Sequence, residues 1–182
     1  MNTKNYNPIQ SDPFSLKTKL KVKLWQIINK TFFKYSPFFC RKYRVWLIRL
    51  FGADVDWTCS LDRHAIIDHP WNLKMGPLSS LKANSWTYCL DKITIGEKCC
   101  ISKHVFLLTG SHKLNSLNFD LITMPIVIKD CVWLSTRANI LPGVTINDFA
   151  VIGANSVVTK SVAAFTIVGG NPAKFIKQRE IK

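Results

Sequence analysis

Apolar residues recur at every sixth position between residues 128 and 158. The positions are Ile128, Leu134, Ile140, Ile146, Ile152 and Val158, and a small or branched residue follows each of them by four. A helix has about 3.6 residues per turn and a strand alternates with a period of two, so neither repeats every six residues over such a length. A period of six indicates a short strand followed by a corner, turn after turn. This is the hexapeptide pattern of a parallel β-helix.

The same spacing is present upstream in another phase. It appears at Ile95, Ile101 and Leu107, and more weakly at Met75, Leu81 and Thr87. Between about residues 113 and 127 the pattern breaks and its phase changes. We therefore expect a loop that leaves the coil there and returns to it. A loop held at both ends by regular walls is suited to carry a functional site.

The first 54 residues lack this repeat and predict helices. From Ser15 onward, apolar residues fall at spacings of three and four, at Leu16, Leu20, Leu24, Ile27, Ile28 and Phe32. They predict one apolar stripe on a helix flanked by lysines. Two interpretations, which do not exclude each other, stay open: the helix packs on the end or side of the coil, or residues 15–50 contact an anionic membrane. A second helix over about residues 40–51, ending at Gly52, could cap the coil.

We divide the chain into a basic, amphipathic helical segment (residues 1–54) and a β-helix domain (residues 55–182). The expected fold is mainly β, with helices at the N-terminus. After the last repeat, Gly169, Gly170 and Pro172 predict a sharp reversal of the chain. Residues 173–182 then predict a short basic helix that returns along the coil.

The chain is strongly basic, with a formal net charge of +14 and a pI of about 9.7. Nucleic acid, an anionic membrane and a polyphosphate cofactor could each explain this charge. Early clustering of the basic residues favours a surface-binding segment, and no recognised nucleic-acid module is present. The N-terminus has no apolar signal core, so we expect a cytoplasmic chain. The six cysteines form no Cys-x-x-Cys pair and predict free thiols in a reducing compartment.

Several motifs occur in a fixed order along the second half of the chain. They are Gly110-Ser111-His112, Val132-Trp133, Pro-Gly-Val-Thr-Ile at 142–146, Ala-Asn-Ser-Val-Val-Thr-Lys at 154–160 and Gly-Asn-Pro-Ala-Lys at 170–174. In this order the chain resembles the hexapeptide-repeat acyltransferases of the left-handed β-helix superfamily. The closer likeness is to the colanic-acid-biosynthesis type of sugar O-acetyltransferase, related to the nodulation, maltose and galactoside acetyltransferases.

The resemblance implies a homotrimer that transfers an acetyl group from acetyl-CoA to a sugar hydroxyl during assembly of a surface polysaccharide. Each site would lie between neighbouring coils, with no metal. Such chemistry needs a base for the hydroxyl proton, and an imidazole suits this role near neutral pH. The family motif assigns the base to His112. The resemblance also assigns acetyl-CoA contacts to Trp133, Ser135, Thr136, Ala154, Thr159 and Lys160.

One position departs from the family pattern, because Lys113 follows the histidine where Asp or another small polar residue is usual. Glycine also follows only some of the repeat positions, as at Gly76, Gly96 and Gly153, so the repeat is degenerate. Together, these two features leave a non-catalytic, membrane-associated scaffold as an alternative. A γ-type carbonic anhydrase is a weaker alternative, since it needs three converging histidines. The four histidines, His64, His69, His104 and His112, are not spaced to repeat along one corner.

Overall fold

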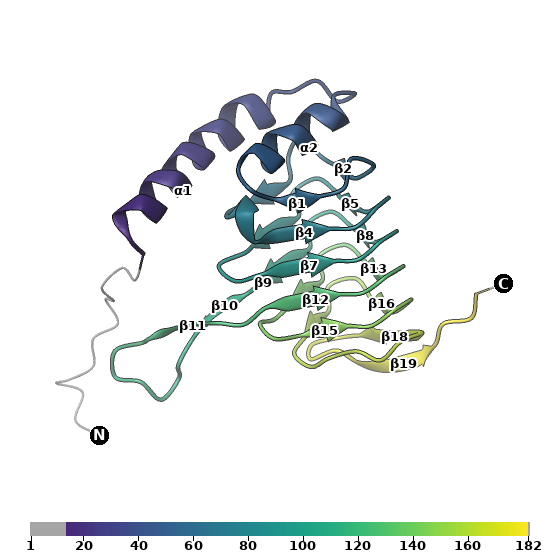
Figure 1. Ribbon diagram of the computed structural model, residues 1–182. Helices are drawn as coiled ribbons and strands as arrows, with labels where there is room; N and C mark the ends of the chain where they lie inside the picture. Colours follow the sequence, from purple (N-terminus) through teal and green to yellow (C-terminus); the bar gives the residue numbers. More distant parts are fainter. Residues whose placement is uncertain (1–13, 182) are drawn as a thin grey trace.

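The computed structural model describes residues 14–181, which form a three-sided coil with two helices at its N-terminal end (Figure 1). Helix α1 (Leu16–Ile28) begins at Ser15, whose hydroxyl accepts a hydrogen bond from the amide of Thr18 at 3.2 Å. Such an N-cap satisfies one of the free amides of the first turn. The helix continues as a π-helical turn, η2 (Asn29–Phe33), and a short connection leads to α2 (Arg41–Leu50).

Helix α1 packs on the coil mainly through residues outside the predicted apolar stripe. Trp25 and Phe33 are the buried residues of α1 and η2, and the Trp25 indole N–H donates to the carbonyl of Ile67 at 2.5 Å. The stripe residues Leu16, Leu20, Leu24, Ile27 and Phe32 are 53–74% exposed. Helix α1 thus packs on the coil, as the first interpretation predicts, although of the stripe residues only Ile28 is partly buried against the core. A buried tryptophan covers more apolar area than a leucine, and here it also finds a hydrogen-bond partner.

The coil consists of three parallel sheets, one on each face of a prism. The first contains β1 (Asp54–Val55), β4 (Leu73–Met75), β7 (Ile93–Ile95), β12 (Ile126–Ile128) and β15 (Thr145–Ile146). The second contains β2 (Ser60–Leu61), β5 (Ser80–Leu81), β8 (Cys100–Ile101), β13 (Trp133–Leu134), β16 (Val151–Ile152) and β18 (Thr166–Gly169), with β19 (Lys174–Gln178) antiparallel at its end. The third contains β3 (Ile66–Ile67), β6 (Trp86–Tyr88), β9 (Phe106–Leu108), β14 (Asn139–Ile140) and β17 (Val157–Val158). A short 3₁₀ helix, η3 (Pro70–Asn72), interrupts the first turn.

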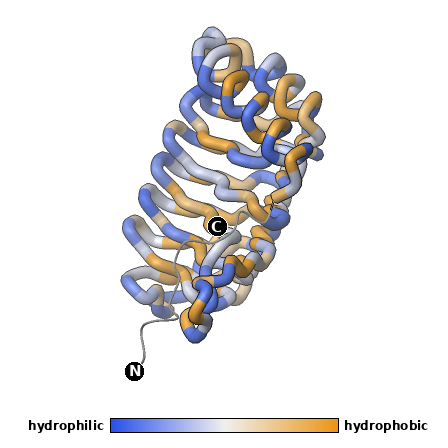
Figure 2. Tube along the Cα trace, turned by 90° about the vertical axis from the view of Figure 1, so that its left-hand side faces the viewer, coloured by the Kyte–Doolittle hydropathy of each residue, from blue (hydrophilic) through white to orange (hydrophobic). Residues whose placement is uncertain are grey.

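The six-residue repeat forms the core of the coil, as predicted. The apolar residues that recur every six positions from Ile128 to Val158 are all buried. Equivalent positions of successive turns stack in register, as Leu134 does on Ile101 and Ile152. Figure 2 shows apolar and polar positions alternating along the turns. The helices share this core, since Trp25, Val45 and Ile48 belong to the same buried cluster.

The corners of the coil are made mostly by residues other than glycine. A left-handed backbone, with φ between 53° and 62°, occurs three residues after many repeat positions, at Leu78, Asn84, Lys98, His104, Cys131, Arg137, Phe149 and Asn155. Gly96, which directly follows a repeat position, instead allows the backbone of the next turn to approach closely. A Cβ there would lie 2.8 Å from the carbonyl carbon of Lys129 on the next turn.

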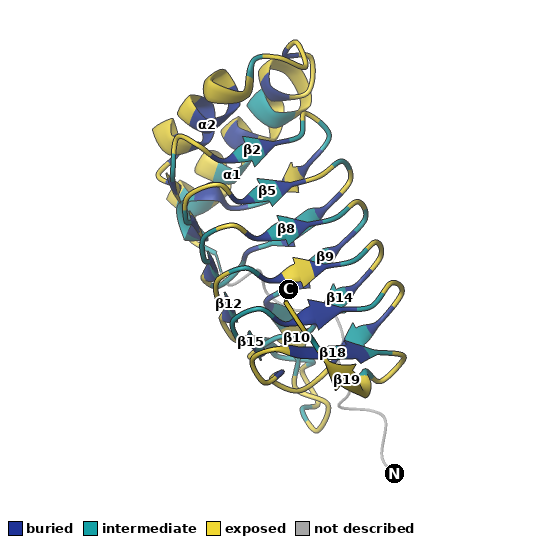
Figure 3. Cartoon of the chain, turned by 90° about the vertical axis from the view of Figure 1, so that its right-hand side faces the viewer, coloured by how far each residue is buried: buried dark blue, intermediate teal, exposed yellow. Residues whose placement is uncertain are grey.

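The C-terminal segment corrects one prediction. The helix predicted over residues 173–182 is not present in the described part, residues 173–181, because Lys174–Gln178 is strand β19, paired antiparallel with β18. The Arg179 guanidinium fastens this segment to the coil by donating to the carbonyls of Cys131 (3.1 Å) and Phe149 (2.9 Å). Strand β18 has β16 on one side only, so its other edge offers unpaired backbone groups that a returning strand can satisfy. Figure 3 shows β19 as an exposed strand at this end of the coil.

The predicted loop is present as a hairpin that leaves the coil between β9 and β12 (Figure 1). Its strands are β10 (Gly110–His112) and β11 (Leu121–Thr123), paired antiparallel. The excursion begins at Gly110, three residues before the predicted boundary. Among residues 14–181, no helix has both the length and the apolar character needed to cross a membrane.

Candidate active site

The hairpin is anchored to the coil through one buried threonine. The Thr109 hydroxyl donates to the carbonyl of Tyr88 at 2.7 Å and accepts from the amide of Asp91 at 3.0 Å. The Thr109 carbonyl accepts from the amide of Met124 at 2.9 Å, on the returning side of the hairpin. Both ends of the hairpin are thus tied to one residue, so its root is rigid although its tip is exposed.

His112 ends strand β10 and has a fixed orientation. Its Nδ1 lies 2.8 Å from the carbonyl oxygen of Phe119, across the hairpin. A carbonyl can only accept, so Nδ1 carries the proton and Nε2 of the neutral ring has a free lone pair. The Phe119 ring stacks on the imidazole, with centroids 4.0 Å apart and planes 12° from parallel. The ring is therefore held by a hydrogen bond and by an aromatic face, with Nε2 available to accept a proton.

The hairpin tip has its own hydrogen bonds, and Lys113 takes part through its backbone. Its amide donates to the carbonyl of Asp120 at 2.9 Å. The Ser116 hydroxyl donates to the Asp120 carboxylate at 2.5 Å. Lys113 is itself exposed. Lys113 therefore adds a cation directly after His112 in the sequence, while its backbone takes part in the pairing of the hairpin.

Four of the predicted cofactor-binding residues lie on or beside the second sheet. Trp133 points outward, 47% exposed, and its indole N–H donates to the Ser102 hydroxyl at 3.1 Å. Ser135 and Thr136 follow it at the next corner, and Ala154 lies one turn further on. The two corners are joined by a 3.0 Å hydrogen bond from the amide of Asn155 to the carbonyl of Thr136. The Ser135 amide likewise donates a hydrogen bond to the carbonyl of Ile152 within the coil, at 2.9 Å. Because the Ser135 amide and the Thr136 carbonyl are already paired, these two residues offer a ligand mainly their side-chain hydroxyls.

Thr159 and Lys160 lie at a different edge of the prism. They follow β17 in the third sheet and are exposed. The hairpin that carries His112 follows β9 of the same sheet. His112, Thr159 and Lys160 thus share one edge, whereas Ser135, Thr136 and Ala154 share another. Within one chain, the structure does not bring these two groups together.

A pocket beside the hairpin root contains residues that the sequence analysis left without a role. It encloses about 360 Å³ between α1 and the coil, and Asp68, His69 and Tyr88 line it together with Lys23 and Gln26 of α1. Gly110 borders it, because a Cβ at Gly110 would lie 2.8 Å from Leu90 and 3.0 Å from Tyr88, which both line the pocket. Three separate segments supply these residues, so no sequence spacing could have grouped them.

The polar groups of this pocket are partly buried, and burial shifts their pKa values. Burial raises the pKa of the Asp68 carboxyl, while a 2.8 Å hydrogen bond from the Trp86 indole opposes that shift. Burial lowers the pKa of His69 and raises that of Tyr88. His69 is 92% buried, and its Nδ1 has no hydrogen-bond partner among the described residues. A buried, unpaired ring nitrogen is costly unless a ligand or water satisfies it.

The other titratable groups of the coil carry no comparable arrangement. His104 occupies a left-handed corner, and His64 contacts Asp62 at 3.3 Å on the surface. Burial raises the pKa values of Cys59, Cys89 and Cys99 to about 11, so these thiols stay protonated and unreactive at neutral pH. In the described part of the chain, no three His, Cys, Asp or Glu side chains are grouped as a metal site.

Comparison with known proteins places these features in context. No family model matches the chain. WcaF of Escherichia coli (strain K12), named as a colanic acid biosynthesis acetyltransferase, is 39% identical over 160 residues, which cover 88% of each protein. The galactoside O-acetyltransferase of the same strain is 35% identical over 89 residues, covering 47% of this chain and 44% of that enzyme. A hexapeptide-repeat acetyltransferase of Vibrio cholerae, solved in complex with acetyl coenzyme A, superposes with a TM-score of 0.83 at 26% identity over the full length of both chains.

Proposed function

Because this chain belongs to the hexapeptide-repeat acetyltransferases of the left-handed β-helix fold, we propose that it transfers the acetyl group of acetyl-CoA to a sugar hydroxyl, with His112 as general base. The observation that supports this role is the 2.8 Å contact between His112 Nδ1 and the Phe119 carbonyl. That contact fixes the tautomer and leaves Nε2 as the acceptor. A general base needs both a free lone pair and a fixed direction.

In the proposed reaction, Nε2 of His112 takes the proton of the sugar hydroxyl as its oxygen attacks the thioester carbonyl. The tetrahedral intermediate collapses, the carbon–sulfur bond breaks, and the CoA thiolate leaves with the proton that His112 acquired. Donors aimed at the developing oxyanion lower the barrier of such a step. The Ser135 and Thr136 hydroxyls are our candidates for contacts at the thioester end. Trp133, Ala154, Thr159 and Lys160 would line the remainder of the acetyl-CoA site.

We further propose that the active enzyme is a homotrimer. The predicted residues form two half-sites on different edges of one prism, so a single chain offers no complete site. Rotation about a threefold axis would place the edge of one subunit that carries His112 against the Ser135–Ala154 edge of its neighbour. Cyclic assembly is a common way for one surface to meet a different surface of an identical copy.

For the acceptor, we propose a sugar unit of a surface polysaccharide under assembly in the cytoplasm. WcaF, which aligns with 88% of this chain, is named for colanic acid biosynthesis, and this name supports such an acceptor. The pocket of Asp68, His69 and Tyr88 is our candidate acceptor site, since it adjoins the hairpin root. Sugars bind through hydroxyls that both donate and accept, and His69 Nδ1, which has no partner within residues 14–181, offers one.

We also include peripheral contact with an anionic membrane through residues 15–50 in the proposed function. The exposed apolar stripe of α1 and its flanking lysines support this contact. A helix of this kind lies in the plane of the membrane interface without crossing it. Enzyme held at the membrane would meet an acceptor that is assembled there.

The central test is acetyl transfer by a His112→Ala variant, followed as release of CoA thiol in the presence of a panel of sugar acceptors. We expect kcat to fall by about two to four orders of magnitude, the usual contribution of a general base, with little change in KM for acetyl-CoA. His104→Asn is the matched control, because asparagine tolerates the left-handed backbone at that corner. Transfer at the wild-type rate by the His112 variant would remove this histidine from the mechanism.

A further inference from the structure

The helical end of the molecule exposes many large apolar residues to solvent. Beyond the stripe of α1, the connection to α2 exposes Tyr35, Phe38 and Phe39 by 69–78%, and α2 adds Trp46 and Leu50. In Figure 3, exposed residues cover much of both helices. Exposed apolar residues gathered in one region mark an interaction site, whereas single ones need no explanation.

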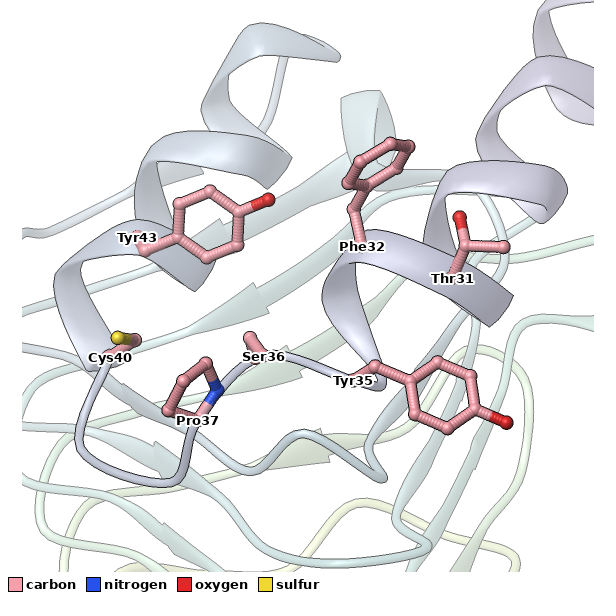
Figure 4. Close-up of a pocket in the computed structure, with 7 residues that line it drawn as sticks. All are labelled: Thr31, Phe32, Tyr35, Ser36, Pro37, Cys40 and Tyr43. Atoms are coloured by element: carbon pink, nitrogen blue, oxygen red, sulfur yellow. The ribbon is translucent and has the colours of Figure 1, made fainter.

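An open hollow lies in this surface, where the π-helical turn meets the start of α2. It encloses about 550 Å³, and Phe32, Tyr35, Pro37, Cys40 and Tyr43 line it (Figure 4). Figure 4 shows the rings of Phe32 and Tyr43 on opposite sides of the hollow, with Pro37 and Cys40 along the connecting chain. The lining is predominantly apolar, so the hollow suits a hydrocarbon chain better than a polar ligand. A π-helical turn is rare and often marks a functional position.

The hollow is held open by a buried arginine. The Arg44 guanidinium donates to the Ser36 hydroxyl at 3.0 Å and to the carbonyls of Pro37 and Phe38 at 2.8 and 2.9 Å. Its Nε donates to the carbonyl of Leu61 in the coil at 2.7 Å. Arg44 therefore fastens the aromatic connection to the coil in one conformation. The exposed rings cannot easily fold back onto the core, so the apolar surface is preformed.

The charge of the same segment decides which partner fits. From Phe14 to Ala53 the chain has ten Lys and Arg residues and no Asp or Glu. Lys30 and Lys34 flank the hollow in sequence, are exposed, and have no ion-pair partner among the described residues. Two copies of this surface would repel each other, whereas an anionic bilayer would attract it. Charge complementarity thus favours lipid over a second copy of the chain.

We propose that this hollow binds one hydrocarbon chain of an anionic phospholipid, while Lys30 and Lys34 meet its phosphate. This inference rests on the membrane contact in the proposed function, and it adds a specific lipid site to a general interfacial helix. The remaining stripe of α1 would lie among the headgroups. Burial of apolar side chains and attraction of lysines to anionic headgroups would both contribute to binding.

The test uses the full-length protein and vesicles of phosphatidylcholine with or without phosphatidylglycerol. We expect binding to be at least about tenfold tighter when phosphatidylglycerol is present, and to weaken by about tenfold or more in a Lys30→Gln/Lys34→Gln variant. The matched control is Lys92→Gln/Lys129→Gln, which removes two exposed lysines of the coil. Equal effects of both double variants would overturn the assignment of the phosphate to this site.

Occupancy of the hollow is read from tryptophan fluorescence with phosphatidylglycerol brominated on its acyl chains. Trp46 stacks on Tyr43, which lines the hollow, with ring centroids 6.0 Å apart. We expect bromine to quench a component of the emission that is missing in Trp46→Phe and reduced in Phe32→Gln. Leu78→Gln, at an exposed position on a coil corner, is the control and should leave the quenching unchanged.

Three outcomes separate the possible explanations. Vesicle binding without quenching of Trp46 would overturn the lipid site while leaving the membrane contact intact. Dissociation of an oligomer by Phe32→Gln, seen in analytical ultracentrifugation, would show instead that this surface is a subunit interface. If His112→Ala retained full transferase activity, the proposed catalytic base would be refuted. Quenching of Trp46 in the same experiment would still support the lipid site.

Discussion

Apolar residues recur at regular intervals in both the coil and helix α1, but they are buried in the coil and mostly exposed in the helix. In the coil, the residues that recur every six positions all point inward, and Ile140 and Leu134 are fully buried. In α1, most of the residues that recur every three to four positions are exposed, and Trp25, which lies off the stripe, is buried. Periodicity therefore predicts which residues share a face. It does not by itself predict whether that face is buried in the protein interior.

The most severe way to test this contrast is to empty one position inside the coil. We expect Ile140→Ala to lower the free energy of unfolding by about 2–5 kcal/mol, because the closely packed turns cannot collapse around the cavity. The measurement is urea denaturation followed by circular dichroism. Ile140→Val is the matched control and should cost about 0.5–1.5 kcal/mol. Near-wild-type stability of the alanine variant would mean that this turn is not a packed core.

The anchoring of α1 should also be sensitive, but at Trp25 and not at the leucines. Trp25→Phe keeps an aromatic ring and removes the indole N–H that donates to the carbonyl of Ile67. We expect a loss of about 1–3 kcal/mol, since a buried carbonyl is left without its partner and the smaller ring leaves space. The same denaturation experiment measures it. No change in stability would place the attachment of α1 elsewhere.

Much of the fold could be predicted from the sequence because each turn of the coil repeats the same local solution. The period of six, the loop after β9 and both N-terminal helices follow from spacing and capping alone. The C-terminal strand could not be predicted, because residues 174–178 pair with an edge of β18 that exists only after the coil has formed. Spacing alone also could not decide whether the stripe of α1 faces the coil or the solvent.

The candidate site, like the fold, has features that the sequence predicts and features that only the folded structure brings together. A motif identified His112, but its tautomer depends on the carbonyl of Phe119, which the hairpin brings across from the other strand. The pocket of Asp68, His69 and Tyr88 is assembled from neighbouring turns and α1, so only the fold groups its residues. The separation of Ala154 from Thr159 onto different edges was also hidden, although only five positions separate them in the sequence.

A third prediction concerns pH and the boundary between the two regions, where His69 lies beneath α1. Burial lowers the pKa of His69, so below an ordinary histidine pKa of about 6.5 the unfolded chain takes up a proton that the folded chain resists. Stability linked to His69 is therefore present above that pH and is lost as the pH falls through the lowered pKa. Melting temperatures measured from pH 7.5 to 5 should fall less steeply in His69→Gln than in the wild type. His64→Gln, on the surface, is the control. Parallel curves for all three proteins would contradict burial of the His69 ring in solution.

The smallest expected effect is the most informative about the helical end. Leu20 lies in the exposed stripe of α1, so Leu20→Ser should change the free energy of unfolding by no more than about 0.5 kcal/mol in the absence of lipid. A leucine that packed on the coil would instead cost several times as much when replaced. With anionic vesicles present, the same substitution should weaken binding, because an apolar side chain no longer enters the interface. A large loss of stability in buffer would show that another part of the protein covers the stripe, and the opposition between the two regions would then disappear. A change seen only with vesicles would mean that both regions bury their apolar residues, one in the protein core and the other in lipid.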